Sequence, residues 1–160
     1  MYTAEPQIIP MLEPADYQAG STDMQSVDMG KLHKLKIVLL LGAITGDGAV
    51  FKLFAGATNG AKTTEMGFKY RIGGADYGAA GSDVFGARAS IAAGASGLVL
   101  TAATHDHKAI TIDVMADEMP EGLKWLTVET DDGSASVLLM SCVGIGAPRF
   151  AGDSHTTAVA

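Results

Sequence analysis

The chain has 160 residues, of which 48% are hydrophobic and only 6% aromatic, and its formal net charge is −7. This length suits one domain with a core of its own, and the acidic balance disfavours unspecific nucleic-acid binding because phosphates would be repelled. The lone Cys142 excludes an internal disulfide, and its apolar neighbours indicate a buried thiol.

The opening residues, MYTAEPQIIP, carry an acid and two prolines where a signal peptide has basic residues and an apolar run. Residues 1–26 contain Pro6, Pro10 and Pro14, a spacing that forbids a helix and favours an extended arm. We therefore expect an arm over 1–26, one domain over 27–150 and a loose tail over 151–160. The longest unbroken apolar run, Ile37–Leu41, is far below the ~20 residues that cross a bilayer, so no membrane partner is expected.

The segment from Lys31 reads KLHKLKIVLLLG, in which Leu35 and Ile37 alternate with Lys34 and Lys36 before the run becomes wholly apolar. This pattern predicts a strand that passes from a half-exposed to a buried environment. Two further segments, AVFKLFAGA and MGFKYRIGG, alternate with the same period of two and are also predicted strands.

Between these two strands lies GATNGAKTT, residues 56–64, which nearly matches the phosphate-binding loop G-x-x-x-x-G-K-[ST]. The second glycine has slipped to Gly60, and Ala61 stands beside Lys62. A phosphate-binding loop runs from a strand into a helix, whose amino end supplies free N–H groups. Because strands are predicted on both sides, the stretch is interpreted as a hairpin turn.

Residues 73–97 are dominated by Gly and Ala and have little to bury, which predicts a long surface excursion. Two interpretations remain open: a mobile loop, or a loop that orders against a partner through Phe85 and Arg88. Strands resume at LVLTAAT, KAITIDVMA, LKWLTVETD and SASVLLMSCVGIG. Seven or eight short strands with glycine-rich turns predict an all-β antiparallel sandwich or barrel, and we favour a jelly roll over an immunoglobulin-like order.

Candidate chemistry is sparse. His105 and His107 lie two residues apart, as a metal pair in a strand would, but without a third ligand in the sequence a solvated turn is favoured. Ser154 in GDSH lacks rigid triad partners, and the acids Asp117, Glu118 and Glu121 crowd a Pro-Gly turn. We expect no catalytic residue, no metal and no cofactor.

The charges are unevenly distributed along the chain. Residues 31–71 contain seven Lys or Arg against Asp47 and Glu65, whereas residues 106–132 contain eight acids against Lys108 and Lys124. Opposite patches could steer head-to-tail or mixed assembly, and two ordinary solvated faces are the alternative.

The order of these features resembles the jelly-roll cement, or decoration, proteins that coat tailed-bacteriophage capsids. The resemblance lies in STDMQSVDMGKLHKLKIVLLLGAITGDGAVFKLFAGAT and in KAITIDVMADEMPEGLKWLTVETDDGSASVLLMSCVGIGAPRF, about half to two-thirds of the chain. The first stretch contains a polar lead-in, a strand, a glycine turn and a second strand. The second stretch contains a strand, an acidic turn, another strand and a buried closing strand.

This resemblance implies a structural protein on the outer capsid surface of the virion that bridges neighbouring major capsid subunits, as a homodimer or homotrimer and without enzymatic activity. The expected partner-interface residues come from the arm, the excursion and the exit after the last strand: Ile8, Ile9, Met11, Leu12, Phe85, Arg88 and Phe150. A receptor- or glycan-binding module of a tail or head fibre is the alternative, although glycan sites usually present more aromatic side chains than this chain has.

Overall fold

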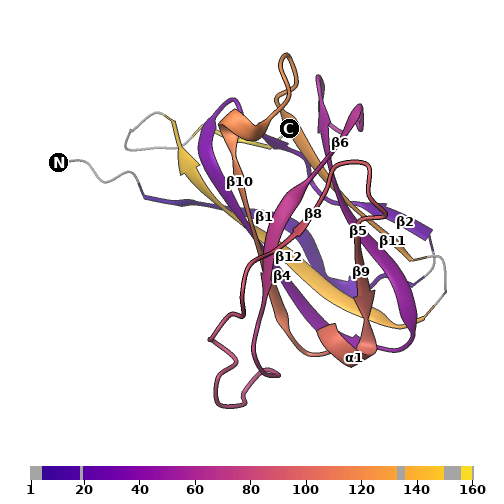
Figure 1. Cartoon of the computed structure of the whole chain (residues 1–160). Helices are drawn as coiled ribbons and strands as arrows, with labels where there is room; N and C mark the ends of the chain where they lie inside the picture. The colour runs from indigo at the N-terminus through magenta and orange to yellow at the C-terminus, as the bar shows by residue number, and fades with distance from the viewer. Residues whose placement is uncertain (1–4, 19, 133–135, 150–155, 160) are drawn as a thin grey trace.

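Two antiparallel sheets pack face to face in the computed structural model, which describes residues 5–18, 20–132, 136–149 and 156–159 (Figure 1). The first sheet has the spatial order β1 (Gln7–Asp16), β12 (Leu138–Pro148), β4 (Leu32–Ile44), β10 (Ala109–Met115), β7 (Phe68–Ile72) and β8 (Ala89–Ile91). The expected all-β antiparallel sandwich is thereby confirmed.

The second sheet is built around the central pair β11 and β5. Its strands are β2 (Gly20–Asp23) and β3 (Val27–Asp28), both paired with β11 (Trp125–Asp132), then β5 (Asp47–Gly56), and β6 (Thr64–Met66) and β9 (Leu98–Thr101), both paired with β5. Two short helical turns, α1 (Ala102–His105) and η1 (Ala116–Glu118), flank β10. Among the described residues, neither of these turns nor any other helix has the length and apolar character to span a membrane.

The core lies between the sheets and follows the predicted period of two. On β4, Leu35, Ile37, Leu39 and Leu41 are fully buried, whereas the residues between them point to the other face. Each such side chain contributes roughly 1.5–3 kcal/mol when removed from water. The rings of Phe51 on β5 and Phe68 on β7 meet edge to face at 5.9 Å and join the two layers. Cys142 is buried as expected, and burial raises its pKa to about 12.

The expected separate arm, residues 1–26, is corrected where its residues 7–16 and 20–23 form strands. Residues 7–16 form the edge strand β1, which pairs with β12, and β2 and β3 pair with β11. Pro10 and Pro14 are compatible with this role because an edge strand needs ladder hydrogen bonds on one side only. The prolines therefore excluded a helix, as expected, but they did not keep this segment out of a sheet.

The expected loose tail is also corrected where it is described. The backbone N–H of Asp28 donates to the carbonyl of Ala158 at 2.7 Å, and the Ala158 side chain is fully buried. The ammonium group of Lys31 donates to the carbonyl of Thr157. Residues 156–159 thus pack on the lead-in to β4, because one small apolar side chain completes the core there.

The Gly/Ala-rich segment is the surface excursion expected from its composition. It leaves β7, contributes only the three-residue edge strand β8, and forms a single bridge between Gly73 and Phe85. The hydroxyl of Tyr77 fastens it to the domain by donating to the carbonyl of Lys108 at 2.8 Å and accepting from the N–H of Leu41 at 3.0 Å.

Candidate interaction surface

The near match to a phosphate-binding loop is a hairpin turn, as predicted. It joins β5 to β6, and the N–H of Thr63 donates to the carbonyl of Ala55 at 3.0 Å. Lys62 lies 2.9 Å from Oδ1 of Asp23 and also contacts Glu129. Hydrogen bonds to Glu129 and Asp23 raise the pKa of Lys62. The lysine is thus occupied by two carboxylates, and β6 stands where a phosphate-binding loop needs a helix.

The two histidines do not act as a pair. His105 is buried at the end of α1, where Nδ1 accepts from the N–H of Thr101 at 3.0 Å, whereas His107 is exposed with a φ of 51°. The expectation of a fully solvated turn is therefore wrong for His105, and burial lowers its pKa. The described residues include no group of three or more His, Cys, Asp or Glu side chains that could hold a metal ion.

The candidate acids are spread over a turn. Glu118 accepts from the N–H of Met115 at 2.9 Å and closes the turn η1, and Asp117 and Glu121 are exposed. Ser154 lies outside the described residues. None of these placements brings an acid and a base together around a reacting atom.

The outer face of the first sheet is the more informative surface. Strand register aligns its outward side chains in rows that cross neighbouring strands. One row runs Ile8, Ile145, Lys36, Asp113, Lys69 and Ser90, and the next runs Pro10, Val143, Val38, Thr111 and Arg71. The rows divide the face into an apolar half on β1, β12 and β4 and a cationic half from β4 to β8.

The apolar half consists of side chains that the chain itself leaves partly uncovered. Ile8 is 72% exposed, and Leu40, Leu139 and Ile145 are each about 40% exposed. Its members are Ile8, Pro10, Val38, Leu40, Leu139, Val143 and Ile145. Contiguous exposed apolar surface of this kind is typical of a contact with another molecule.

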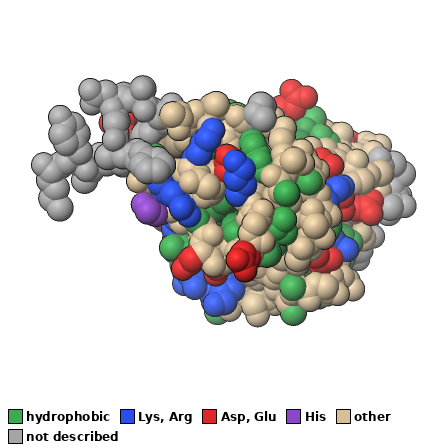
Figure 2. Space-filling model, turned by 90° about the horizontal axis from the view of Figure 1, so that it is seen from above, with side chains coloured by type: hydrophobic (Ala, Val, Ile, Leu, Met, Phe, Trp, Pro, Cys, Tyr) green, Lys and Arg blue, Asp and Glu red, His purple; other side chains and the backbone are tan. Residues whose placement is uncertain are grey.

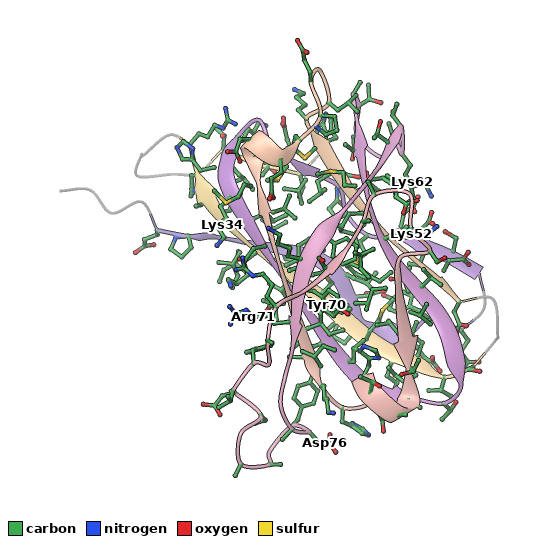
Figure 3. All side chains as sticks on the ribbon, in the orientation of Figure 1. Lys34, Lys52, Lys62, Tyr70, Arg71 and Asp76 are labelled. Carbon is green, nitrogen blue, oxygen red and sulfur yellow. The ribbon has the colours of Figure 1, made fainter. Side chains whose placement is uncertain are left out.

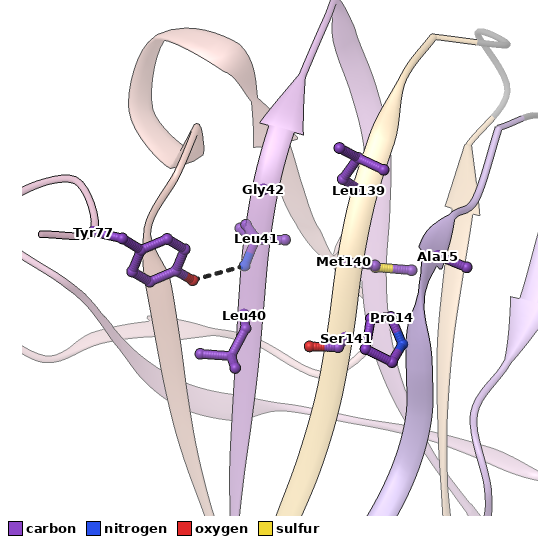
Figure 4. Close-up of a pocket in the computed structure, with 9 residues that line it drawn as sticks. All are labelled: Pro14, Ala15, Leu40, Leu41, Gly42, Tyr77, Leu139, Met140 and Ser141. Atoms are coloured by element: carbon purple, nitrogen blue, oxygen red, sulfur yellow. Dashed lines mark hydrogen bonds between the residues drawn. The ribbon is translucent and has the colours of Figure 1, made fainter.

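A hollow of about 350 Å³ lies in this half where β4, β12 and β1 run side by side, and Leu40, Tyr77 and Leu139 are among the residues that line it (Figure 4). The hydrogen bond from Leu41 to the Tyr77 hydroxyl holds the ring at its rim. Pro14 and Ser141 lie on the opposite side. The hollow can accept an apolar side chain but offers few polar groups to orient a small molecule.

The basic side chains of the cationic half surround Asp113 on β10. The ammonium groups of Lys34 and Lys36 lie 2.9 and 3.2 Å from its Oδ1, and the guanidinium of Arg88 lies 3.9 Å from its Oδ2. Partial burial acts to raise the pKa of Asp113, but the two ammonium groups outweigh it and hold the pKa below its usual range. With Lys69 and Arg71 on β7, the group formed by these five cations and Asp113 has a net charge of +4, and Glu118 lies at its edge.

The outer face of the second sheet has a different charge pattern. Lys52 pairs with Glu65 at 3.8 Å, and Lys62 pairs with Asp23 and Glu129. Figure 3 shows Lys34 and Arg71 on one side of the sandwich and Lys52 and Lys62 on the other. The view from above likewise shows basic side chains gathered toward the left, with hydrophobic and a few acidic ones among them (Figure 2). Basic charge is therefore unbalanced mainly on the first sheet.

The expected interface residues do not form one cluster. Ile8 is exposed beside Ile145, but Ile9 and Met11 are 2% and 3% exposed and belong to the core, which corrects their expected role as anchors. They are buried because alternate residues of an edge strand point to opposite faces. The remaining residues differ in setting: Leu12 and Phe85 are partly buried, Arg88 contacts Asp113, and Phe150 lies outside the described residues.

The sequence analysis marked residues 31–71 as basic and Arg88 as an interface residue, but it did not join them into one cationic site. The alternation of Lys34 and Lys36 with buried residues was visible, as was that of Lys69 and Arg71, so their outward direction could be predicted. The sequence could not predict that β4 and β7 lie on either side of β10, because the three strands are far apart in sequence. Asp113 from the acidic segment 106–132 contacts Lys34 and Lys36 from the basic segment 31–71, so the two segments are in contact on this face.

The described residues define an antiparallel β-sandwich with one half-apolar, half-cationic sheet face. No family model matches the chain, and no curated protein and no solved structure was found to be similar to it.

Proposed function

We propose that the chain is a structural protein of jelly-roll type that binds the outer surface of a bacteriophage capsid and bridges neighbouring major capsid subunits. The observation that carries the proposal is the first-sheet outer face, which leaves an apolar half and a cationic half uncovered side by side. The resemblance described above supplies the kind of partner and the location on the virion.

The strand order supports the jelly-roll type. The order β1-β12-β4-β10 in one sheet faces β2-β11-β5-β9 in the other. Along these eight strands the chain changes sheets between β1 and β2, β2 and β4, β4 and β5, β9 and β10, β10 and β11, and β11 and β12, while β5 and β9 are neighbours in one sheet. This is the exchange expected of eight strands in two Greek keys. Strands β6, β7 and β8 form an insertion between β5 and β9, in which β6 pairs with β5 and only β7 and β8 widen the first sheet beyond β10.

The size of the face supports a protein partner. The six strands lie ~4.8 Å apart and have three to thirteen residues, on average roughly 25 Å at ~3.3 Å per residue, so the face has an area of roughly 600 Å². A stable interface buries about 800 Å² on each partner, so this face supplies most of one contact. Many copies on a shell would reinforce one another, and association into a homodimer or homotrimer there belongs to the same proposal.

The test is cosedimentation of the purified chain with capsids that were assembled without it. Replacing Leu40 with Asp should weaken binding by about tenfold or more, because an apolar contact is lost and a charge is desolvated. Val99→Asp is the matched control, since Val99 is 40% exposed on the second sheet and Leu40 is 39% exposed on the first.

Equal binding by the two variants would reject this face, and an unmodified chain that does not sediment with capsids would reject the function. Binding to host envelopes instead of capsids would favour the receptor- or glycan-binding alternative.

A further inference from the structure

We propose that the cationic half recognises carboxylates on an extended acidic segment of the partner protein, with Lys69 and Arg71 forming the new ion pairs. This inference rests on the proposed function, because it names the chemistry of the partner that the same face would contact.

The first argument is the uneven pairing within the cationic half. Asp113 is shared by Lys34, Lys36 and Arg88, each within 4.0 Å. Lys69 and Arg71 are exposed on the neighbouring strand, and neither forms an ion pair with any residue that the structure describes. Asp113 therefore organises one part of the group and leaves two cations available to a partner.

The second argument is the spacing of these two cations. Lys69 and Arg71 are two residues apart on β7, so both point outward and their Cα atoms are separated by ~6.6–6.8 Å. Carboxylates on alternate residues of an extended segment have the same separation. Arg71 can bind one carboxylate through two parallel hydrogen bonds, and Lys69 can bind the next as a point charge.

The third argument is selectivity for a protein over a nucleic acid. The cationic half has a balance of +4, so the remainder of the chain carries −11 for the whole to reach −7. Glu118 stands close by, because it lines a small hollow together with Lys69 and Asp113. A continuous polyanion that extended past β7 would meet this acidic surrounding. A short acidic segment next to apolar residues matches both halves of the face.

The experiment is a nuclear magnetic resonance titration of the full chain with a synthetic peptide in which Glu and Thr alternate over about ten residues. We expect saturable shifts centred on β7 that weaken several-fold between about 50 and about 500 mM salt. The double variant Lys69→Gln/Arg71→Gln should bind about fivefold or more weakly. Thr58→Glu/Asn59→Glu is the control, because it lowers the net charge equally at the exposed β5–β6 turn and should bind as the unmodified chain does.

Several results would overturn the inference. In the peptide titration they are an absence of shifts on β7, equal shifts with the uncharged Gln-Thr peptide, or unchanged affinity in the double variant. Tighter binding of an oligonucleotide at the same residues, or concentration-dependent self-association through β7 without peptide, would show a different occupant. Capsid cosedimentation separates the two proposals. A chain that binds the peptide but not capsids would reject the function alone, and one that binds capsids but not the peptide would reject this inference alone.

Discussion

Lys36 on β4 and Asp113 on β10 are direct register partners, and their charged groups lie 3.2 Å apart on the outer face of the first sheet. The register partner of Asp113 on its other side is Lys69 on β7. One carboxylate thus stands between two basic strands. It limits the repulsion among cations that the sheet brings together, at a position where like charges on adjacent strands would be destabilising.

Replacing Asp113 with Asn tests this role. We expect a loss of about 0.5–1 kcal/mol in the free energy of unfolding, larger at low salt, because Lys34, Lys36 and Arg88 would lose their common partner. Urea unfolding at two salt concentrations measures it. Asp117→Asn, an equal charge change at an exposed position, is the control. An equal loss in the two variants would contradict the role of Asp113.

The same carboxylate predicts an acid-dependent loss of stability. Its folded-state pKa lies below the ordinary value of 3.8. Its contribution is therefore complete above that value and is lost as the pH falls through the folded-state pKa. Subtracting the pH dependence of Asp113→Asn from that of the unmodified chain should leave a difference that is constant near neutral pH and disappears in strong acid. A difference that persists in acid would exclude this linkage.

The setting of His105 predicts that folding stability depends on pH in a second, higher pH range. Burial lowers its pKa below 6.5, and its Nδ1 must be unprotonated to accept from Thr101. The unfolded chain then binds a proton more readily than the folded one, so stability is full above pH 6.5 and falls as the pH drops toward the folded-state pKa.

The variant His105→Asn keeps a hydrogen-bond acceptor near the position of Nδ1 but cannot gain a proton. Thermal unfolding of this variant should lose the pH dependence that the unmodified chain shows just below pH 6.5. His107→Asn, at the exposed position two residues on, is the control and should retain it. The same slope in His105→Asn as in the unmodified chain would assign that dependence to other groups.

The two hydrogen bonds of the Tyr77 hydroxyl are expected to fasten the surface excursion, residues 73–97, to the sandwich. Replacing Tyr77 with Phe removes the hydroxyl that links Leu41 to Lys108, at a cost of about 1 kcal/mol, and should speed proteolysis within residues 73–97. Tyr17→Phe removes a hydroxyl that, within the described part of the chain, donates to the carbonyl of Glu13, and it serves as the control. Cleavage at the unmodified rate in Tyr77→Phe would show that other contacts hold the excursion.

The close packing around Gly56 predicts that the β5–β6 turn does not tolerate a larger residue at this position. A Cβ at this position would overlap the backbone carbonyl of Ala61, so Gly56→Ala should cost about 2 kcal/mol or more. Gly86→Ala, where a Cβ would meet only an ordinary contact, should change stability by less than about 1 kcal/mol. Chemical denaturation of the two variants gives the comparison, and equal midpoints would contradict the close approach.

The sequence by itself determined the all-β class, the direction of most strand side chains and the β5–β6 hairpin. Each of these follows from local chemistry: a period of two places Leu35 and Lys36 on opposite faces, and glycine-rich turns end the strands. The local pattern also showed that residues 7–16 are extended, because Pro10 and Pro14 exclude a helix.

Only the tertiary structure decided which extended segments are neighbours. Backbone hydrogen bonds to β12 turned the expected arm into an edge strand and buried Ile9 and Met11, and a gap in the core took up Ala158. Asp113 came to lie between Lys36 and Lys69 in the same way. Strand pairing joins residues that are distant along the chain, and no local period encodes that choice, so the half-apolar, half-cationic face exists only once the sheet has formed.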